Sequence, residues 1–78
     1  MKIETKFGAR VKELRLKKNL SQEALAHEAD IDRTYMTSVE NGKRNISIQN
    51  IEKIIKALGV SFAEFFNDNG FKKKLRRR

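Results

Sequence analysis

Residues 21–41 read SQEALAHEADIDRTYMTSVEN and predict two short helices joined by a tight turn. Ser21 precedes the first helix and Asp32 the second, and their side-chain oxygens can accept free N–H groups of a first helical turn. Met36 and Val39 lie three residues apart in the second helix, which predicts one narrow apolar face. The other side chains then face outward with hydroxyl, phenol and guanidinium groups that can bind polar edges, namely Arg33, Thr34, Tyr35, Thr37 and Ser38.

Apolar residues at helical spacing also predict a helix before this stretch. Residues 1–5 have no periodic pattern and are expected to fray, and Thr5 is a candidate cap. Asn19 can end the helix because asparagine tolerates the left-handed backbone conformation. The inner face of the helix is predicted to carry Phe7, Val11, Leu14 and Leu16.

A fourth helix is predicted between Ser47, a candidate cap, and Gly59, which can adopt the positive φ that ends a helix. Gly42 supplies the same freedom where the preceding helix stops. The apolar residues at helical spacing here are Ile48, Ile51, Ile54, Ile55 and Leu58.

Ser61 and Glu64 form a capping box for a short fifth helix over residues 62–67. The sequence shows no alternating pattern typical of strands. Five helices with short polar connections predict a compact all-α domain.

The central stretch resembles the helix-turn-helix of the lambda-repressor and Cro-like family, also called XRE-type. The flanking segments RVKELRLKKNLSQEALA and VENGKRNISIQNIEKIIKALGV extend the resemblance to about residues 7–66. Within the family, Asp32 to Tyr35 followed by Asn45 and Ile46 is most similar to the controller proteins of restriction–modification systems. The resemblance implies a five-helix lambda-repressor-like DNA-binding domain whose second and third helices form the helix-turn-helix.

Four side chains of the third helix are candidates for contacts with DNA bases. Arg33 can bind guanine O6 and N7 in the major groove, and Thr34 can offer a hydroxyl to a base edge and a methyl group to thymine. The resemblance implies base contacts by residues at the positions of Arg33, Thr34 and Thr37. Arg33 has the alternative of a solvated surface arginine paired with an acidic residue. Tyr35 has two open alternatives, which are contact with DNA and packing against the second helix.

A second set of side chains is predicted to contact DNA phosphates. Gln22 begins the second helix, where backbone N–H groups attract anions, and the resemblance implies the same role. Arg44 and Asn45 follow the third helix and would contact the backbone, with Ser38 and Lys43 as additional phosphate contacts. The alternative for Gln22 is an ordinary exposed residue at a helix start.

Two further sets of residues are predicted to hold the protein together. The resemblance implies a buried ion pair between Arg15 and Glu40, which would join the first helix to the end of the third. Aromatic residues of the fifth helix, with part of the fourth, are a candidate dimer interface: Val60, Phe62, Phe65 and Phe66. The alternative is that the phenylalanines only cover the core.

The composition excludes several classes of site. The 78 residues include no cysteine and one histidine, so neither a disulfide nor a thiolate metal site can form. His27 is expected to be solvated beside Glu23, without a further ligand or a nucleophile nearby. We therefore expect no metal, no cofactor and no enzymatic activity. The sequence has no apolar run of the ~20 residues that a membrane span needs and no signal peptide, so a cytoplasmic protein is expected.

The net charge of +8 is concentrated near the C-terminus, where residues 72–78 carry six lysines and arginines. We expect a DNA-binding domain over residues 1–70 and a disordered basic tail over residues 71–78. The tail can bind phosphates non-specifically, lie on an anionic membrane or remain a solvated end, and the first of these is favoured.

These observations predict a sequence-specific transcriptional regulator that binds double-stranded DNA as a homodimer on a palindromic operator. The resemblance to controller proteins implies control of a restriction endonuclease, as activator and as repressor, with RNA polymerase as a further candidate partner. The alternative is an antitoxin-like protein-interaction module that shares the fold and carries a segment for binding another protein.

Overall fold

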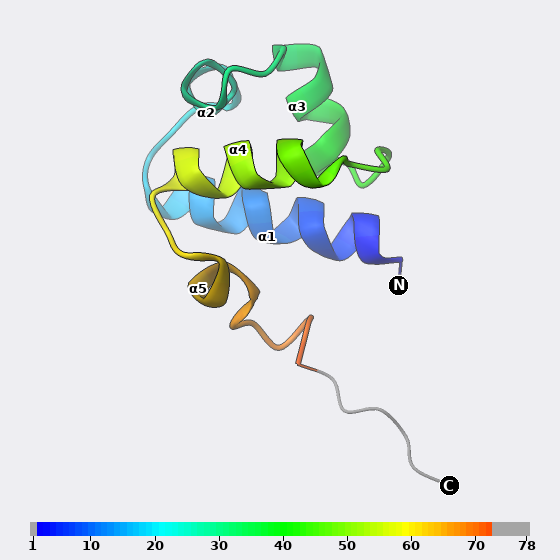
Figure 1. Cartoon of the computed structure of the whole chain (residues 1–78). Helices are drawn as coiled ribbons and strands as arrows, with labels where there is room; N and C mark the ends of the chain where they lie inside the picture. The colour runs from blue at the N-terminus through cyan, green and yellow to red at the C-terminus, as the bar shows by residue number, and fades with distance from the viewer. Residues whose placement is uncertain (1, 73–78) are drawn as a thin grey trace, which may run out of the picture.

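Five α-helices joined by short connections make up the computed structural model, which describes residues 2–72 (Figure 1). In Figure 1, α2 and α3 lie on one side of α1 and α4, and α5 lies on the opposite side. No strand occurs among residues 2–72, so the all-α prediction with five helices is confirmed. The bounds are α1 Ile3–Lys17, α2 Gln22–Ala29, α3 Arg33–Glu40, α4 Ile48–Leu58 and α5 Phe62–Phe66.

Side-chain caps define where four of the helices begin. The Ser21 hydroxyl accepts the Ala24 N–H at 3.0 Å, and one Asp32 carboxylate oxygen accepts the Thr34 N–H at 2.9 Å. Ser47 and Ser61 cap α4 and α5 in the same way. These contacts satisfy N–H groups that have no partner within a helix, and they confirm the predicted helix starts.

Residues with positive φ end the helices or begin the turns that follow. Asn19 follows α1 with a φ of 57°, and Asp30 forms the C-cap of α2 with a φ of 56°. Gly42 and Gly59 have φ values of 72° and 75°. The left-handed conformation lets the chain turn sharply, so α2 and α3 come together across a very short connection.

Three predictions near helix ends were wrong. Helix α1 begins at Ile3, so Thr5 lies inside the helix and does not cap it. Leu16, predicted to face inward, is 55% exposed because it follows Leu14 by two residues and lies on another face of the helix. Ile48 is 77% exposed because it is the first residue of α4 and extends beyond the core.

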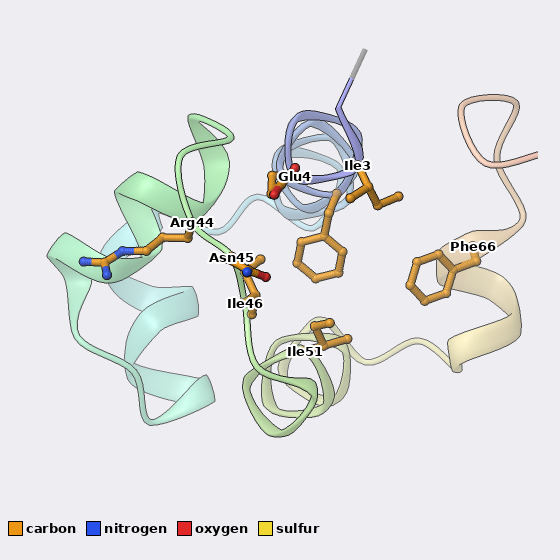
Figure 2. A pocket seen from close by; sticks show the side chains of 8 residues that line it. Ile3, Glu4, Arg44, Asn45, Ile46, Ile51 and Phe66 are labelled. Atoms are coloured by element: carbon orange, nitrogen blue, oxygen red, sulfur yellow. The ribbon is translucent and has the colours of Figure 1, made fainter.

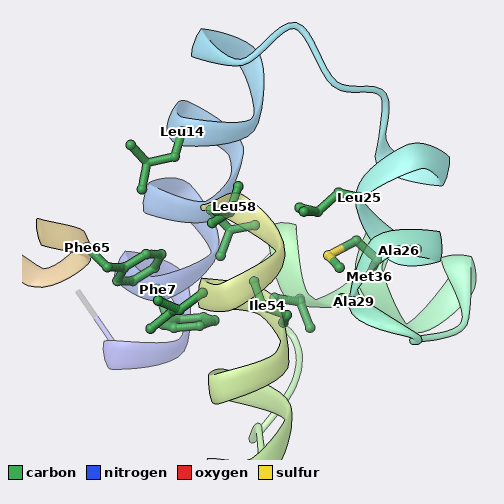
Figure 3. Packing of buried hydrophobic residues seen from close by; sticks show 12 residues of the cluster. Phe7, Leu14, Leu25, Ala26, Ala29, Met36, Ile54, Leu58 and Phe65 are labelled. Carbon is green, nitrogen blue, oxygen red and sulfur yellow. The ribbon is translucent and has the colours of Figure 1, made fainter. Parts of the chain in front are cut away.

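Buried side chains from all five helices form one hydrophobic core (Figure 3). Helix α3 contributes Met36 and Val39, both 0% exposed, which confirms its predicted apolar face. Because these two residues anchor the helix from one side, its opposite face remains available to solvent. The other members are Phe7, Val11, Leu14, Leu25, Ala26, Ala29, Ile54, Ile55, Leu58 and Phe65.

A buried arginine fastens α5 to α1. Arg10 donates from Nε to the Phe65 carbonyl oxygen at 2.7 Å and from Nη2 to the Glu64 carbonyl oxygen at 2.9 Å. Its Nη1 lies 3.0 Å from a Glu13 carboxylate oxygen. Carbonyl groups at the end of a helix lack partners within that helix, so Arg10 satisfies two of them and orients this short element.

Phe71, which was predicted to belong to the disordered tail, packs against α5. The Phe71 ring lies 5.0 Å from the Phe66 ring, centroid to centroid, in an edge-to-face arrangement. The expected tail begins at this residue, and its positions 73–78 lie outside the described residues. Among residues 2–72, no helix combines the length and the apolar character that crossing a membrane requires.

Helices α1 and α3 approach each other closely at Gly8. A Cβ atom placed there would collide with the Val39 carbonyl oxygen and lie 2.9 Å from the Glu40 carbonyl oxygen. The absence of a side chain at Gly8 therefore lets α1 contact the backbone at the end of α3 directly.

Replacement of Gly8 by alanine is expected to lower the free energy of unfolding by about 1–3 kcal/mol, because the added methyl group forces the two helices apart. At an open helical position the same change raises this free energy by about 1 kcal/mol. Urea denaturation followed by circular dichroism measures the difference. The control is Ala9→Gly, at the exposed neighbouring position, with an expected loss of about 0.5–1 kcal/mol. A Gly8→Ala variant more stable than the parent would contradict the close approach.

Candidate nucleic-acid interface

The exposed face of α3 forms one wall of an open hollow on the protein surface. Arg33 and Thr34 are exposed, while Thr37 and Ser38 are half-buried on the same side of the helix. The hollow is lined by Arg33, Thr34, Thr37, Ser38, Asn41 and Lys43. Five of these six residues come from the two predicted sets of DNA contacts. The sixth, Asn41, was predicted only as a helix end, and its position beside Lys43 is set by the turn.

A bidentate ion pair fixes the end of α3 to α1. Arg15 donates from Nε to Glu40 Oε2 at 2.7 Å and from Nη2 to Glu40 Oε1 at 3.0 Å. It also donates from Nη1 to the Leu20 carbonyl oxygen at 2.7 Å. The Glu40 side chain is only 2% exposed, so the predicted pair is present and is buried.

The side chain of Gln22 connects this ion pair to the hollow. Gln22 Nε2 donates to Glu40 Oε1 at 3.0 Å, and Gln22 Oε1 accepts the Thr37 hydroxyl at 3.0 Å. Gln22 was predicted from its place at a helix start, where it does lie, to contact phosphate. Its contacts with α3 were not predicted, because Thr37 and Glu40 follow Gln22 by 15 and 18 positions and no local sequence pattern connects residues so far apart.

Arg44 lies against α3 rather than extending freely from its loop. Its guanidinium carbon is 4.7 Å from the centroid of the Tyr35 ring, and its Nε donates to Ser38 Oγ at 3.4 Å. Tyr35 is half-buried and packs against the core, so only part of its ring is exposed. The contact is a cation–π interaction, which brings the Arg44 charge close to the outward face of α3.

An apolar groove lies between α1, α4 and α5 (Figure 2). Figure 2 shows Ile3, Ile51 and Phe66 bordering the groove, while Arg44 is directed away from it. Ile3 is 61% exposed. Ile48, which is 77% exposed, lies next to the groove because it precedes Ile51 by nearly one turn of α4. The other lining residues are Glu4, Phe7, Asn45 and Ile46.

The predicted dimer interface agrees only in part with this surface. Phe65 is 0% exposed and packs 5.0 Å from the Phe7 ring, so its assignment to an interface was wrong. Phe62 is 42% exposed, and Val60 and Phe66 are half-buried. Ile3 was not predicted as part of this surface, although it is an exposed aliphatic residue at the start of a helix.

His27 is exposed on α2, as expected. Within residues 2–72, the side chains of His, Cys, Asp and Glu form no cluster of three or more that could hold a metal ion.

Comparison with known proteins gives consistent matches. A helix-turn-helix family model matches residues 11–65. The chain is 51% identical over 67 residues to control protein C.MunI of a Mycoplasma species, covering 85% of this chain and 90% of that protein. It is 58% identical over 55 residues to control protein C.BamHI of Bacillus amyloliquefaciens, covering 69% and 68% of the two chains.

A solved structure of a third controller protein has the same fold. The restriction-modification controller protein C.Esp1396I, bound to a 25 base pair operator site, matches with a TM-score of 0.80 and 38% sequence identity. The match covers 85% of this chain and 87% of that chain.

Replacement of Glu40 by alanine is expected to lower the free energy of unfolding by about 3–5 kcal/mol, because Arg15 then remains buried without a counter-charge. Urea denaturation measures the loss. The matched control is Glu52→Ala, which removes an exposed pair with Lys56 at 3.6 Å and is expected to change stability by less than about 1 kcal/mol. Equal losses for the two variants would contradict a dominant role for the buried pair.

Proposed function

We propose that this chain, which belongs to the helix-turn-helix family and to its restriction–modification controller proteins, binds a two-fold symmetric operator as a homodimer and regulates transcription. The observation that carries this proposal is the outward face of α3. It presents several polar side chains beside one hollow, while the opposite face is anchored in the core. An α-helix of this kind fits the major groove, where each base pair presents a distinct pattern of donors and acceptors.

Within this proposal the exposed side chains divide into two groups. Base edges are bound by Arg33, Thr34, Tyr35 and Thr37, with Arg33 directed to guanine O6 and N7. Phosphates are bound by Gln22, Lys43, Arg44 and Asn45, which fix the position of α3 on the duplex. Ser38 acts through Arg44, whose Nε donates to Ser38 Oγ at 3.4 Å. The hollow supports this division, because Arg33 lies at the first turn of α3 and Lys43 lies beyond its last turn.

We further propose that the dimer forms through the groove between α1, α4 and α5 and the exposed apolar side chains beside it. Ile3, Ile48 and Phe62 are 61%, 77% and 42% exposed in the monomer. Groups of exposed apolar side chains are typical of protein–protein interfaces. A two-fold axis at this face would place the two α3 helices about one duplex turn apart, ~34 Å, which matches a symmetric operator.

We infer the biological role of this chain from its membership of the restriction–modification controller proteins. One relative is described as bound to an operator site, and the same activity is proposed for this chain. It would adjust expression of a restriction endonuclease and of its own promoter, as repressor or activator according to operator position. RNA polymerase is then the proposed partner in activation. For this role the protein needs only to bind DNA and does not need to catalyse a reaction. We propose that it acts in the cytoplasm.

The proposed DNA-binding domain covers residues 1–70, followed by a basic tail over residues 71–78. The packing of Phe71 on Phe66 attaches the first tail residue to the domain. The lysines and arginines that follow would add non-specific attraction to phosphates and make affinity depend strongly on salt.

Titration against duplexes with and without the operator palindrome tests sequence recognition. We expect affinities that differ by far more than threefold. Arg33→Ala should relax the preference at one base pair in each half-site, since a bidentate contact is worth about 1–3 kcal/mol of discrimination. Lys43→Ala is the matched control, because loss of a phosphate contact weakens binding to all duplexes alike. Equal affinities for all duplexes would reject the proposal.

The dimer interface is tested by Ile48→Glu, which adds a charge next to the apolar groove. Sedimentation analysis is expected to show a shift from dimer to monomer, because a buried unpaired carboxylate strongly disfavours association. Leu16→Glu is the control, since Leu16 is also an exposed apolar residue of the monomer but lies more than two turns of α1 beyond Phe7, whereas Ile48 lies within one turn of Ile51. A dimer that persists in Ile48→Glu and dissociates in Leu16→Glu would place the interface elsewhere.

A further inference from the structure

The buried carboxylate of Glu40 determines how the Gln22 amide is oriented. An ionised carboxylate only accepts hydrogen bonds, and Glu40 already accepts two from Arg15. Gln22 must therefore direct its amide nitrogen toward Glu40 Oε1, at 3.0 Å. The amide oxygen consequently faces α3, where it can only accept a hydrogen bond.

This orientation determines which hydrogen-bonding role remains for Thr37. The Thr37 hydroxyl has one proton, and two oxygens lie within hydrogen-bond distance of it. These are Gln22 Oε1 at 3.0 Å and the Arg33 carbonyl oxygen at 3.1 Å, and both are acceptors. The proton is therefore held inside the protein, and Thr37 Oγ1 has only lone pairs left for a molecule in the hollow.

The charged groups in the hollow have the opposite hydrogen-bonding role. Arg33 and Lys43 line the same hollow, and their charged ends can only donate hydrogen bonds. Ser38 Oγ donates to the Thr34 carbonyl oxygen at 2.9 Å and accepts from Arg44 Nε at 3.4 Å, so its proton and one of its two lone pairs are used within the protein. Thr37 thus adds an acceptor to a surface whose charged groups are donors.

We propose that Thr37 selects its base pair as a hydrogen-bond acceptor, by binding the exocyclic amino group of adenine (N6) or cytosine (N4) in the major groove. Guanine O6, thymine O4 and purine N7 are acceptors and would face its lone pairs. The proposal rests on the proposed function, since it specifies one contact of the α3 face with operator DNA. It also assigns the buried Arg15–Glu40 pair an influence on specificity, through the Gln22 amide.

The test uses operator duplexes in which single major-groove atoms are removed. Purine in place of adenine and 2-pyrimidinone in place of cytosine remove the amino groups. 2-Aminopurine in place of guanine and 5-methyl-2-pyrimidinone in place of thymine remove the carbonyl oxygens. Wild type and Thr37→Val are titrated against each duplex. Valine keeps the shape of threonine and lacks the hydroxyl, and Thr37→Ser is the control that retains it.

We expect removal of the amino group from one half-site to weaken wild type and Thr37→Ser about tenfold, as for loss of one hydrogen bond. The same removal should leave the affinity of Thr37→Val unchanged within twofold. Coupling of Thr37 to a carbonyl oxygen, or to no atom of the operator, would overturn the proposal. Wild type that binds operator and unrelated duplexes equally would instead overturn the proposed function, so the two failures are distinguishable.

Discussion

The bidentate contact between Arg15 and Glu40 sets the position of α3 in this small domain. Only two side chains of α3, Met36 and Val39, are fully buried, so packing by itself leaves little to define the rotation of an eight-residue helix. The ion pair adds a directional contact at the end of α3, where Gly8 also allows α1 to touch the backbone. Packing and electrostatics therefore act at the same point and hold the exposed face in one orientation.

The buried Glu40 carboxylate is also connected to the proposed recognition surface through hydrogen bonds. Glu40 accepts from Gln22, and Gln22 accepts from Thr37, so hydrogen bonds run from the interior of the protein to the hollow. Buried polar groups of this kind must be fully satisfied, and no buried side-chain nitrogen or oxygen in the described residues lacks a partner. A change at Glu40 would consequently alter both stability and the chemistry presented to DNA, which separates it from purely structural core residues.

The proposed dimer interface and the proposed DNA-binding face lie on different parts of the surface. The polar hollow lies along α3, whereas the apolar groove lies between α1, α4 and α5. Arg44 borders both regions, since it lines the groove and its Nε donates to Ser38 Oγ, which lines the hollow. Arg10 has a comparable role at the other side, where it holds α5 in place through two backbone carbonyl groups. Short elements in a domain of this size thus depend on single arginine side chains for their placement.

The amino-acid sequence alone was enough to define four of the five helix starts and the outward face of α3, because caps, positive-φ residues and apolar spacing act between near neighbours. Ser21 and Asp32 were predicted correctly as helix caps, and Gly59 as a helix end, because these roles depend only on neighbouring residues. The burial of Phe65 and the contacts of Gln22 depended on elements brought together by folding. Side chains of one residue type, such as the phenylalanines of α5, have the same local pattern whether they face the core or the solvent, and only packing against α1 distinguishes them.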